Sequence, residues 1–178
     1  MSGVSRNGRH RPQATPGHGR AEPRVAVVVA APEWRRRLRS AATVARRAAQ
    51  AALNAGRARG VVELAVVLAD NRTSRRLNRT WRGKDKATNV LSFALGDAAP
   101  KGAPRLLGDV VIAGGVTAAE ADAQGKTLTA HLAHLVVHGV LHLLGHDHER
   151  AAEARRMEAL EVRVLRGLGV ADPYRMQP

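Results

Sequence analysis

The chain has 178 residues, enough for one domain with a hydrophobic core, and its lack of cysteine excludes disulfides and thiolate metal sites. It has no run of about 18 apolar residues that would predict a membrane span, and its basic N-terminal residues lack the apolar segment of a secretory signal. The net charge of +14 favours a polyanionic partner, most simply nucleic acid, although part of the arginine content is alternatively only solvated helix surface. With 2% aromatic residues, base stacking is disfavoured and contacts to phosphate are expected.

The sequence divides into a tail, one domain and a second short tail. Residues 1–23 are rich in Gly, Pro and Arg, which predicts a disordered segment that is either an electrostatic arm for RNA or an incidental extension. We expect a single domain over residues 24–172 and a C-terminal tail over 173–178. A chain without cysteine is also compatible with the reducing cytoplasm.

The domain is predicted to contain four strands and five helices. Runs of β-branched and apolar residues predict strands at 24–31, at 61–70, in the second half of 81–95 and at 107–114. Apolar residues spaced three and four apart predict helices at 33–54, 71–80, 117–124, 127–145 and 149–168. Asp70 or Asn71 is expected to cap the second helix, and Thr117 the third, with Glu120 in a capping box. Strands and helices do not alternate strictly, which favours an α+β fold with one small sheet covered by helices.

The segment HGVLHLLGHDH, residues 138–148, has the spacing of a metal site. His138 and His142 are four residues apart on the predicted helix, so both rings project from one face and can bind one ion. Gly145 supplies the left-handed residue that ends the helix and turns the chain, so that His148 can reach the same ion. Three neutral nitrogens leave a coordination position open, as in catalytic zinc sites. We therefore predict one Zn²⁺ per chain, while other divalent metals remain possible.

Other polar residues near this motif have weaker support. His131 and His134 lie earlier on the same helix, and we favour core or surface histidines with satisfied hydrogen bonds over a contact to a ligand histidine or to substrate. His146 points either to solvent or toward substrate. Asp147 either orients a ligand imidazole or serves as a plain turn residue.

Zinc peptidases share this histidine spacing, but they carry a catalytic glutamate where this chain has Gly139. Glu149 is predicted to begin the next helix and is a poor substitute. A zinc metallopeptidase-like hydrolase is therefore the alternative enzyme. The non-catalytic alternative is an rRNA-binding ribosome-assembly factor with a structural zinc, in which Asp147 or His146 completes the ligand set.

Three blocks of the sequence resemble the YbeY family, bacterial metal-dependent endoribonucleases of rRNA maturation. HGVLHLLGHDH resembles the family signature, WRGKDKATNVLSFAL its R-G-K-D-x-P-T-[ND]-V-L-S-F segment, and LLGDVVIA its L-G-D-I-x-I strand. The resemblance covers roughly residues 24–170. Ala87 replaces a proline of the family pattern, and His146 stands where tyrosine is frequent, which touches the rim of the site.

The resemblance implies a small mixed four-stranded sheet packed with helices around a central metal-binding helix. It implies a zinc bound by His138, His142 and His148, and a functional arginine at Arg82, so these four residues are the predicted catalytic set. The implied activity is single-strand-specific cleavage of rRNA precursors, especially near the 3′ end of the small-subunit RNA, together with ribosome quality control. The implied partners are small-subunit ribosomal proteins or assembly factors in the cytoplasm.

The surroundings of Arg82 agree with an RNA substrate. Residues 72–86 contain seven basic residues and one acidic residue, Asp85. A guanidinium can bind two phosphate oxygens at once, so we predict that Arg82, in a loop, positions the RNA backbone beside the metal. The alternative is that Arg82 only pairs with Asp85 or caps a helix.

Overall fold

The computed structural model describes residues 23–58, 60–96, 103–146 and 150–175. Its centre is a four-stranded sheet with the order β1-β2-β4-β3. The strands are β1 (Arg24–Val29), β2 (Val62–Ala69), β3 (Val90–Ala94) and β4 (Arg105–Ala113). β1 and β4 both run parallel to β2, while β3 pairs with β4 in the antiparallel direction. The predicted α+β fold with a mixed four-stranded sheet is therefore confirmed, and β3 lies at an edge of that sheet.

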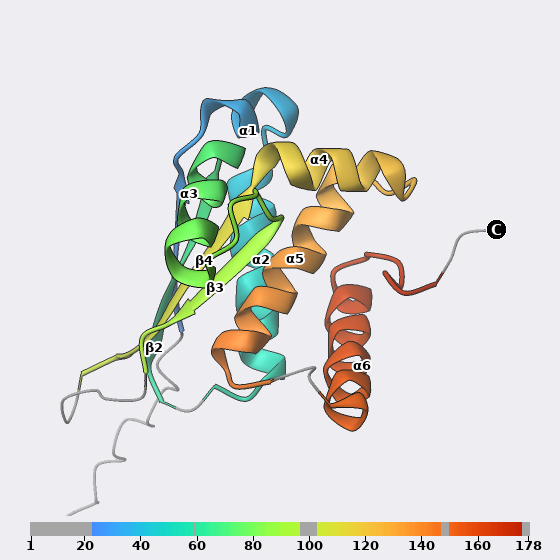
Figure 1. Cartoon of the computed structure of the whole chain (residues 1–178). Coiled ribbons are helices and arrows are strands. Elements are labelled where there is room, and N and C mark those ends of the chain that lie inside the picture. The colour runs from blue at the N-terminus through green and yellow to red at the C-terminus, as the bar shows by residue number, and fades with distance from the viewer. Residues whose placement is uncertain (1–22, 59, 97–102, 147–149, 176–178) are drawn as a thin grey trace, which may run out of the picture.

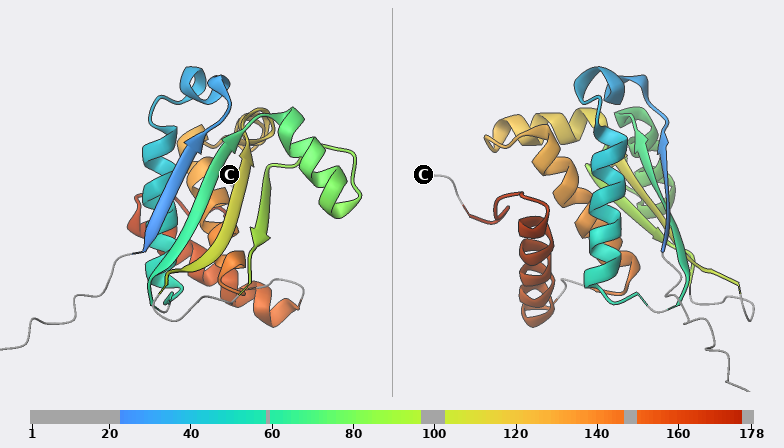
Figure 2. Two further views of the ribbon diagram at one scale, coloured as in Figure 1. Left: turned by 90° about the vertical axis from the view of Figure 1, so that its left-hand side faces the viewer. Right: turned by 180° about the vertical axis from the view of Figure 1, so that it is seen from behind.

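Helices cover the two faces of the sheet unequally (Figures 1 and 2). The helices of the described residues are α1 (Pro32–Arg37), α2 (Ala41–Ala55), α3 (Asn71–Arg82), α4 (Gly114–Ala123), α5 (Leu128–Leu143) and α6 (Ala151–Gly167). α2 and α5 pack side by side on one face, and α6 packs against the outer side of α5, whereas α3 lies across the opposite face near β3. The described residues contain no candidate membrane-spanning helix.

The main core lies between the sheet and the α2–α5 pair. α2 contributes a stripe of alanines, and these small side chains let the helix lie close to the strands and to α5. α5 is apolar on almost every side because the sheet, α2 and α6 all surround it. A smaller cluster of Ala69, Leu91 and Val111 lies beneath α3 on the other face. The histidine helix is therefore the central helix of the fold.

The predicted helix over 33–54 is wrong in one respect, because the structure divides it into α1 and α2. The break falls at Leu38, whose backbone is extended at φ −149° and ψ 96°. Trp34 on α1 is fully buried, and its ring nitrogen donates to the carbonyl of Ala69, 3.0 Å away at the end of β2. One straight helix cannot both cover the strand ends with Trp34 and run along the sheet as α2 does.

The predicted start of the helix at 117 is also wrong. α4 begins at Gly114, and Thr117 lies inside it, where its hydroxyl donates to the carbonyl of Ala113 at 2.7 Å. A side chain at Gly114 would begin 2.6 Å from the carboxylate of Glu33. Glycine at the start of α4 thus allows close packing beneath α1, and this tertiary requirement outweighs the local capping pattern.

The glycine of the LLGDVVIA block, Gly108, is required by its backbone conformation and its surroundings. Its φ is 132°, and a Cβ atom there would lie 1.9 Å from the carbonyl oxygen of Phe93 on β3. The pairing of β2 with β4 also shifts register beside this glycine. Only glycine satisfies both the left-handed backbone and the close approach of β3. The residue therefore fixes the position of the edge strand.

Candidate metal and RNA site

The ends of α5 follow the sequence prediction. Thr127 caps the helix, and its hydroxyl accepts a hydrogen bond from the Ala130 amide at 3.1 Å. At the other end Gly145 has a φ of 85°, and the amides of Gly145 and His146 donate to the carbonyls of His142 and Leu141. These two bonds form a Schellman motif, which reverses the chain direction just after the histidines.

His138 and His142 bring two ring nitrogens together near the C-terminal end of α5. Their Nε2 atoms are 3.1 Å apart, and the rings meet nearly at right angles. Two Zn–N bonds of about 2.0–2.1 Å at a tetrahedral angle place the nitrogens about 3.3 Å apart. The 3.1 Å separation is that of a hydrogen bond between the two rings, and it is also close to the spacing of two ligands of one ion.

The rest of the predicted ligand set lies outside the described residues. This applies to His148, and to Asp147 and Glu149 beside it. Among the residues that the structure describes, no group of three His, Cys, Asp or Glu side chains is arranged to hold a metal. The three-histidine site therefore stays a prediction, with two of its members placed together.

A buried carboxylate lies directly behind this histidine pair. The Glu161 side chain, from α6, is 1% exposed, and its Oε1 accepts a hydrogen bond from Nδ1 of His138 at 2.8 Å. Its Oε2 accepts from Nε2 of His134 at 3.0 Å and from the hydroxyl of Tyr174. Burial alone would raise the pKa of Glu161, but the bonds from His134, His138 and Tyr174 outweigh it and lower the pKa to about 2.

Sequence reasoning missed Glu161, although a signal for it was present. The apolar ridge of α6 contains Met157, Leu160 and Val164, and Glu161 lies on that same ridge. A charged residue on an otherwise apolar helix face predicts a buried charge with partners. The partner Tyr174 carries no comparable signal, because it follows the helix in an irregular segment.

His131 is a buried, hydrogen-bonded histidine as the sequence analysis favoured, whereas His134 fits the alternative of a residue that supports a ligand histidine, because it shares the Glu161 carboxylate with His138. Nε2 of His131 lies 2.9 Å from the carboxylate of Glu120, which also accepts from the side chain of Asn89. Burial lowers the pKa of His131, and the nearby Glu120 opposes that shift. His134 bonds Glu161, so it supports the ring of His138 from behind.

Gly139 is required by packing. A Cβ atom there would lie 2.6 Å from Cγ1 of Val110 and 3.0 Å from Oγ of Ser92. The Ser92 hydroxyl also donates to the Gly139 carbonyl at 3.2 Å. Any side chain at this position would enter the surface of β3 and β4, so the position cannot supply the general base of a zinc peptidase.

Arg82 is the last residue of α3, and its predicted location in a loop is wrong. The helix continues to Arg82 because Gly83, with a φ of 67°, supplies the left-handed cap. Asp85 does not pair with Arg82. It forms a two-bond ion pair with Arg75, at 2.8 and 2.9 Å, which lowers the pKa of the Asp85 carboxyl. The alternative role of Arg82 as the partner of Asp85 is therefore excluded.

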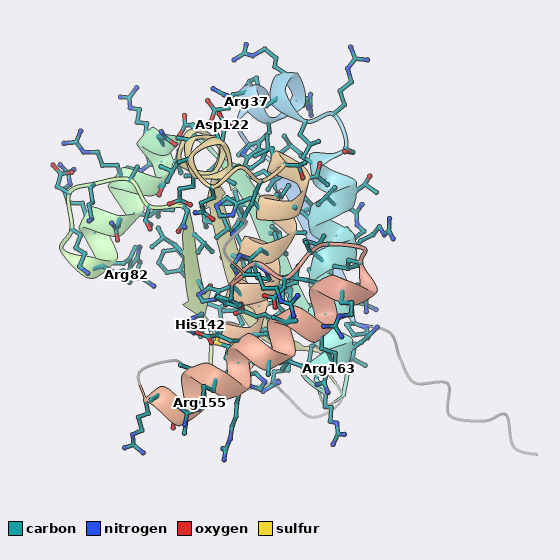
Figure 3. The ribbon with its side chains drawn as sticks, turned by 90° about the vertical axis from the view of Figure 1, so that its right-hand side faces the viewer. Arg37, Arg82, Asp122, His142, Arg155 and Arg163 are labelled. Atoms are coloured by element: carbon teal, nitrogen blue, oxygen red, sulfur yellow. The ribbon has the colours of Figure 1, made fainter. Side chains whose placement is uncertain are left out.

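The arginine and histidine segments border the same edge strand. Trp81, next to Arg82, makes an edge contact with Phe93 of β3, with the ring centres 6.1 Å apart. Gly139, next to His138, contacts Ser92 of the same strand. Figure 3 shows Arg82 at the C-terminal end of α3 and His142 near that of α5. The edge of β3 thus lies between a basic helix end and the convergent histidines.

The fold and site define an α+β protein whose central histidine helix lies beside the edge of a mixed sheet. The model of the family described as "Endoribonuclease YbeY" matches residues 31–169, and the chain belongs to this family. An "Endoribonuclease YbeY" of Paramagnetospirillum magneticum is 54% identical over 84% of this chain and 94% of its own length. The relative of that name from Rhodopseudomonas palustris strain HaA2 is 48% identical, over 86% of this chain and 83% of its own length.

A solved structure resembles the fold at lower sequence identity. A solution structure of a Thermotoga maritima protein superimposes with a TM-score of 0.53 and 19% identity, and it covers 85% of this chain and 99% of its own. At this level of identity the likeness concerns the fold alone.

Proposed function

We propose that this chain is a metal-dependent endoribonuclease that cleaves single-stranded segments of rRNA precursors. Membership of the Endoribonuclease YbeY family supports the activity and an RNA substrate. The observation that carries the metal dependence is the convergence of the His138 and His142 Nε2 atoms at 3.1 Å, with a buried carboxylate behind them. A pair of imidazoles backed by a carboxylate is a common form of zinc site.

The proposed site residues have different roles in phosphodiester cleavage. His138, His142 and His148 would hold Zn²⁺ or another divalent ion. When bound, such an ion neutralises charge on a phosphoryl group and lowers the pKa of a bound water. Arg82 would bind phosphate oxygens with its two-pronged guanidinium and so hold the RNA backbone along the edge of β3.

The same family membership supports a proposed biological setting. We propose processing near the 3′ end of the small-subunit rRNA and ribosome quality control, with small-subunit ribosomal proteins or assembly factors as partners, in the cytoplasm. We also propose that residues 24–172 form one catalytic domain with a tail before it, while Pro173 and Tyr174 of the segment predicted as a C-terminal tail pack against this domain. The net charge of +14 suits an RNA substrate.

The alternatives are less well supported. The peptidase requires a base that position 139 cannot carry, since a Cβ atom there would meet Val110 at 2.6 Å. A structural zinc would need a fourth protein ligand. The residues predicted for that role are His146 and Asp147, and Asp147 lies outside the described residues. Tyr174 and Glu161 do not act as a fourth ligand, because they hydrogen-bond each other behind His138.

The decisive experiment incubates the purified protein with single-stranded and structured RNA, with and without a chelator. We expect cleavage of single-stranded RNA that chelation and His142→Ala both abolish. Cleavage that survives both would contradict the metal mechanism, and cleavage of an unstructured protein would favour the peptidase.

A charge-reversal pair tests the phosphate role. Arg82→Glu should weaken RNA cleavage strongly, whereas Arg37→Glu should have little effect. Arg37 is likewise an exposed arginine at the end of a helix, but it lies on α1, away from His142 (Figure 3). Equal effects of the two substitutions would show only a loss of net charge and no specific role for Arg82.

A further inference from the structure

We propose that Glu161 is a positioning residue for the metal site, which fixes the tautomer and orientation of His138, and that Tyr174 in turn fixes Glu161. The proposal rests on the metal site proposed above. It extends that site from the histidine helix to α6 and to the segment after it. Neither Glu161 nor Tyr174 would touch the metal or the RNA.

The hydrogen bond to Glu161 sets the tautomer of His138. Its Nδ1 lies 2.8 Å from Oε1 of Glu161, and an ionised carboxylate can only accept, so Nδ1 carries the proton. The neutral ring then has its lone pair on Nε2, the atom that faces Nε2 of His142 at 3.1 Å. Glu161 therefore selects the form of His138 that can bind a metal there.

The Glu161 carboxylate is itself held by hydrogen bonds. The two oxygens of Glu161 have separate partners: Oε1 accepts from His138, while Oε2 accepts from His134 and Tyr174. Because Oε2 is held from two directions, the carboxylate is kept with Oε1 toward His138. The ring of His138 is thus aligned by a carboxylate that is itself fixed.

Tyr174 lies in an irregular segment after α6, and this segment is held in place by its own contacts. Lys126, just before α5, donates to the carbonyl of Pro173 at 2.8 Å, and the Tyr174 amide donates to Asp172 at 3.0 Å. The ring of Tyr174 also packs edge-on against His134, with the centres 5.6 Å apart. These contacts hold the segment over the base of the site and direct the hydroxyl onto Glu161.

The place of Glu161 in the fold would suit an apolar side chain. The Glu161 side chain is 1% exposed and lies on the apolar ridge of α6, where a leucine or methionine would bury at no cost in charge desolvation. A buried charge at such a position is explained when another group needs it. The group that depends on it here is the ring of His138.

Zinc affinity measured by competition with a chromophoric chelator tests the proposal. Glu161→Gln keeps the shape of the side chain and should weaken zinc binding about 10–100-fold, the usual effect of losing such a supporting group. Tyr174→Phe should weaken it toward the lower end of that range. Glu158→Gln, an exposed residue on the same helix, is the matched control and should bind zinc as the wild type does.

A second measurement separates positioning from general destabilisation. The nitrogen chemical shifts of His138 in the metal-free protein should show Nδ1 protonated in the wild type and a mixture of tautomers in Glu161→Gln. Unchanged zinc affinity in Glu161→Gln, or weaker affinity with unchanged His138 shifts, overturns the proposal. If Glu161→Gln does not fold, Tyr174→Phe decides, and unchanged affinity in that variant overturns it.

The same zinc titration separates the proposed metal site from the proposed role of Glu161. A wild-type protein that binds no zinc or other divalent metal would overturn the proposed metal site itself. A wild type that binds zinc normally beside a Glu161→Gln variant that does the same would leave the metal site intact and overturn only the role of Glu161.

Discussion

The two sides of the β3 edge are built in opposite ways. On the histidine side, the His138 side chain is 26% exposed and is held by a carboxylate that is 1% exposed. On the arginine side, the side chains of the Arg75–Asp85 pair are 59% and 49% exposed, and Arg82 projects from a helix end. Buried contacts fix geometry, whereas exposed charges supply a field that salt screens. We therefore expect changes on the histidine side to alter stability and metal binding, and changes on the arginine side to alter salt-dependent RNA binding and, through it, RNA cleavage.

The largest effect should come from placing the peptidase glutamate on the histidine side. Gly139→Glu forces a Cβ atom to within 2.6 Å of Val110 and buries an unpaired carboxylate. Overpacking and burial of the charge together should lower the free energy of unfolding by more than about 3 kcal/mol. Urea denaturation measures this loss, and no peptidase activity should appear.

Gly167→Glu is the matched control for that variant, since a Cβ atom at Gly167 on α6 meets nothing within 4 Å. It should be neutral, or more stable by up to about 1 kcal/mol because glycine is a poor helix former. Similar losses in the two variants, or a peptidase gained by Gly139→Glu, would contradict the view that α5 is pressed against the sheet at this position.

Metal removal should have the next largest effect. Ligand binding stabilises the folded state by about 2.7 kcal/mol when the free metal is at 100 times its dissociation constant. A chelator should therefore lower the unfolding temperature of the wild type and leave that of His142→Ala unchanged. Arg82→Lys should respond to the chelator as the wild type does, because Arg82 lies on the other side of β3. A chelator response in His142→Ala would show that its ring is no ligand.

The sequence predicted the parts of the site that depend on local patterns. The spacing of His138 and His142 on a helix, the start of that helix at about Thr127 and its stop at Gly145 are all set within a few residues, and the structure confirms each of them. The strands followed in the same way from runs of β-branched residues. The basic character of α3 was also visible from composition alone.

The parts that depend on distant contacts could not be predicted in this way. Glu161 reaches His138 across 23 positions of sequence, and Trp34 reaches the Ala69 carbonyl across 35. The first contact holds the ring of His138 from another helix, and the second accompanies the break in a helix that the apolar spacing alone predicts as continuous. Thr117 has the local pattern of a cap, but packing beneath α1 moves the start of α4 to Gly114.

On the arginine side, Arg82→Ala should change RNA binding without changing the fold. Loss of one phosphate contact should weaken binding to single-stranded RNA and reduce the slope of log K against log salt by about 0.7. The free energy of unfolding should stay within about 0.5 kcal/mol of the wild type, because the side chain is exposed and makes no hydrogen bond or ion pair with the residues that the structure describes. An unchanged salt slope, measured by fluorescence anisotropy, would show that Arg82 contacts no phosphate.

The smallest effect should be the pH dependence that His131 contributes to stability. Burial lowers the pKa of His131 in the folded protein, although Glu120 opposes the shift, while in the unfolded chain the ring takes up its proton near pH 6.5. The unfolded state thus binds more protons, so this contribution is complete above pH 6.5 and is lost as the pH falls below that value. For one proton, the free energy of unfolding changes with pH by at most about 1.4 kcal/mol per pH unit. Metal-free His131→Gln should lose stability less steeply than the metal-free wild type between pH 6.5 and 5, and coincident slopes would show that His131 is protonated equally in both states.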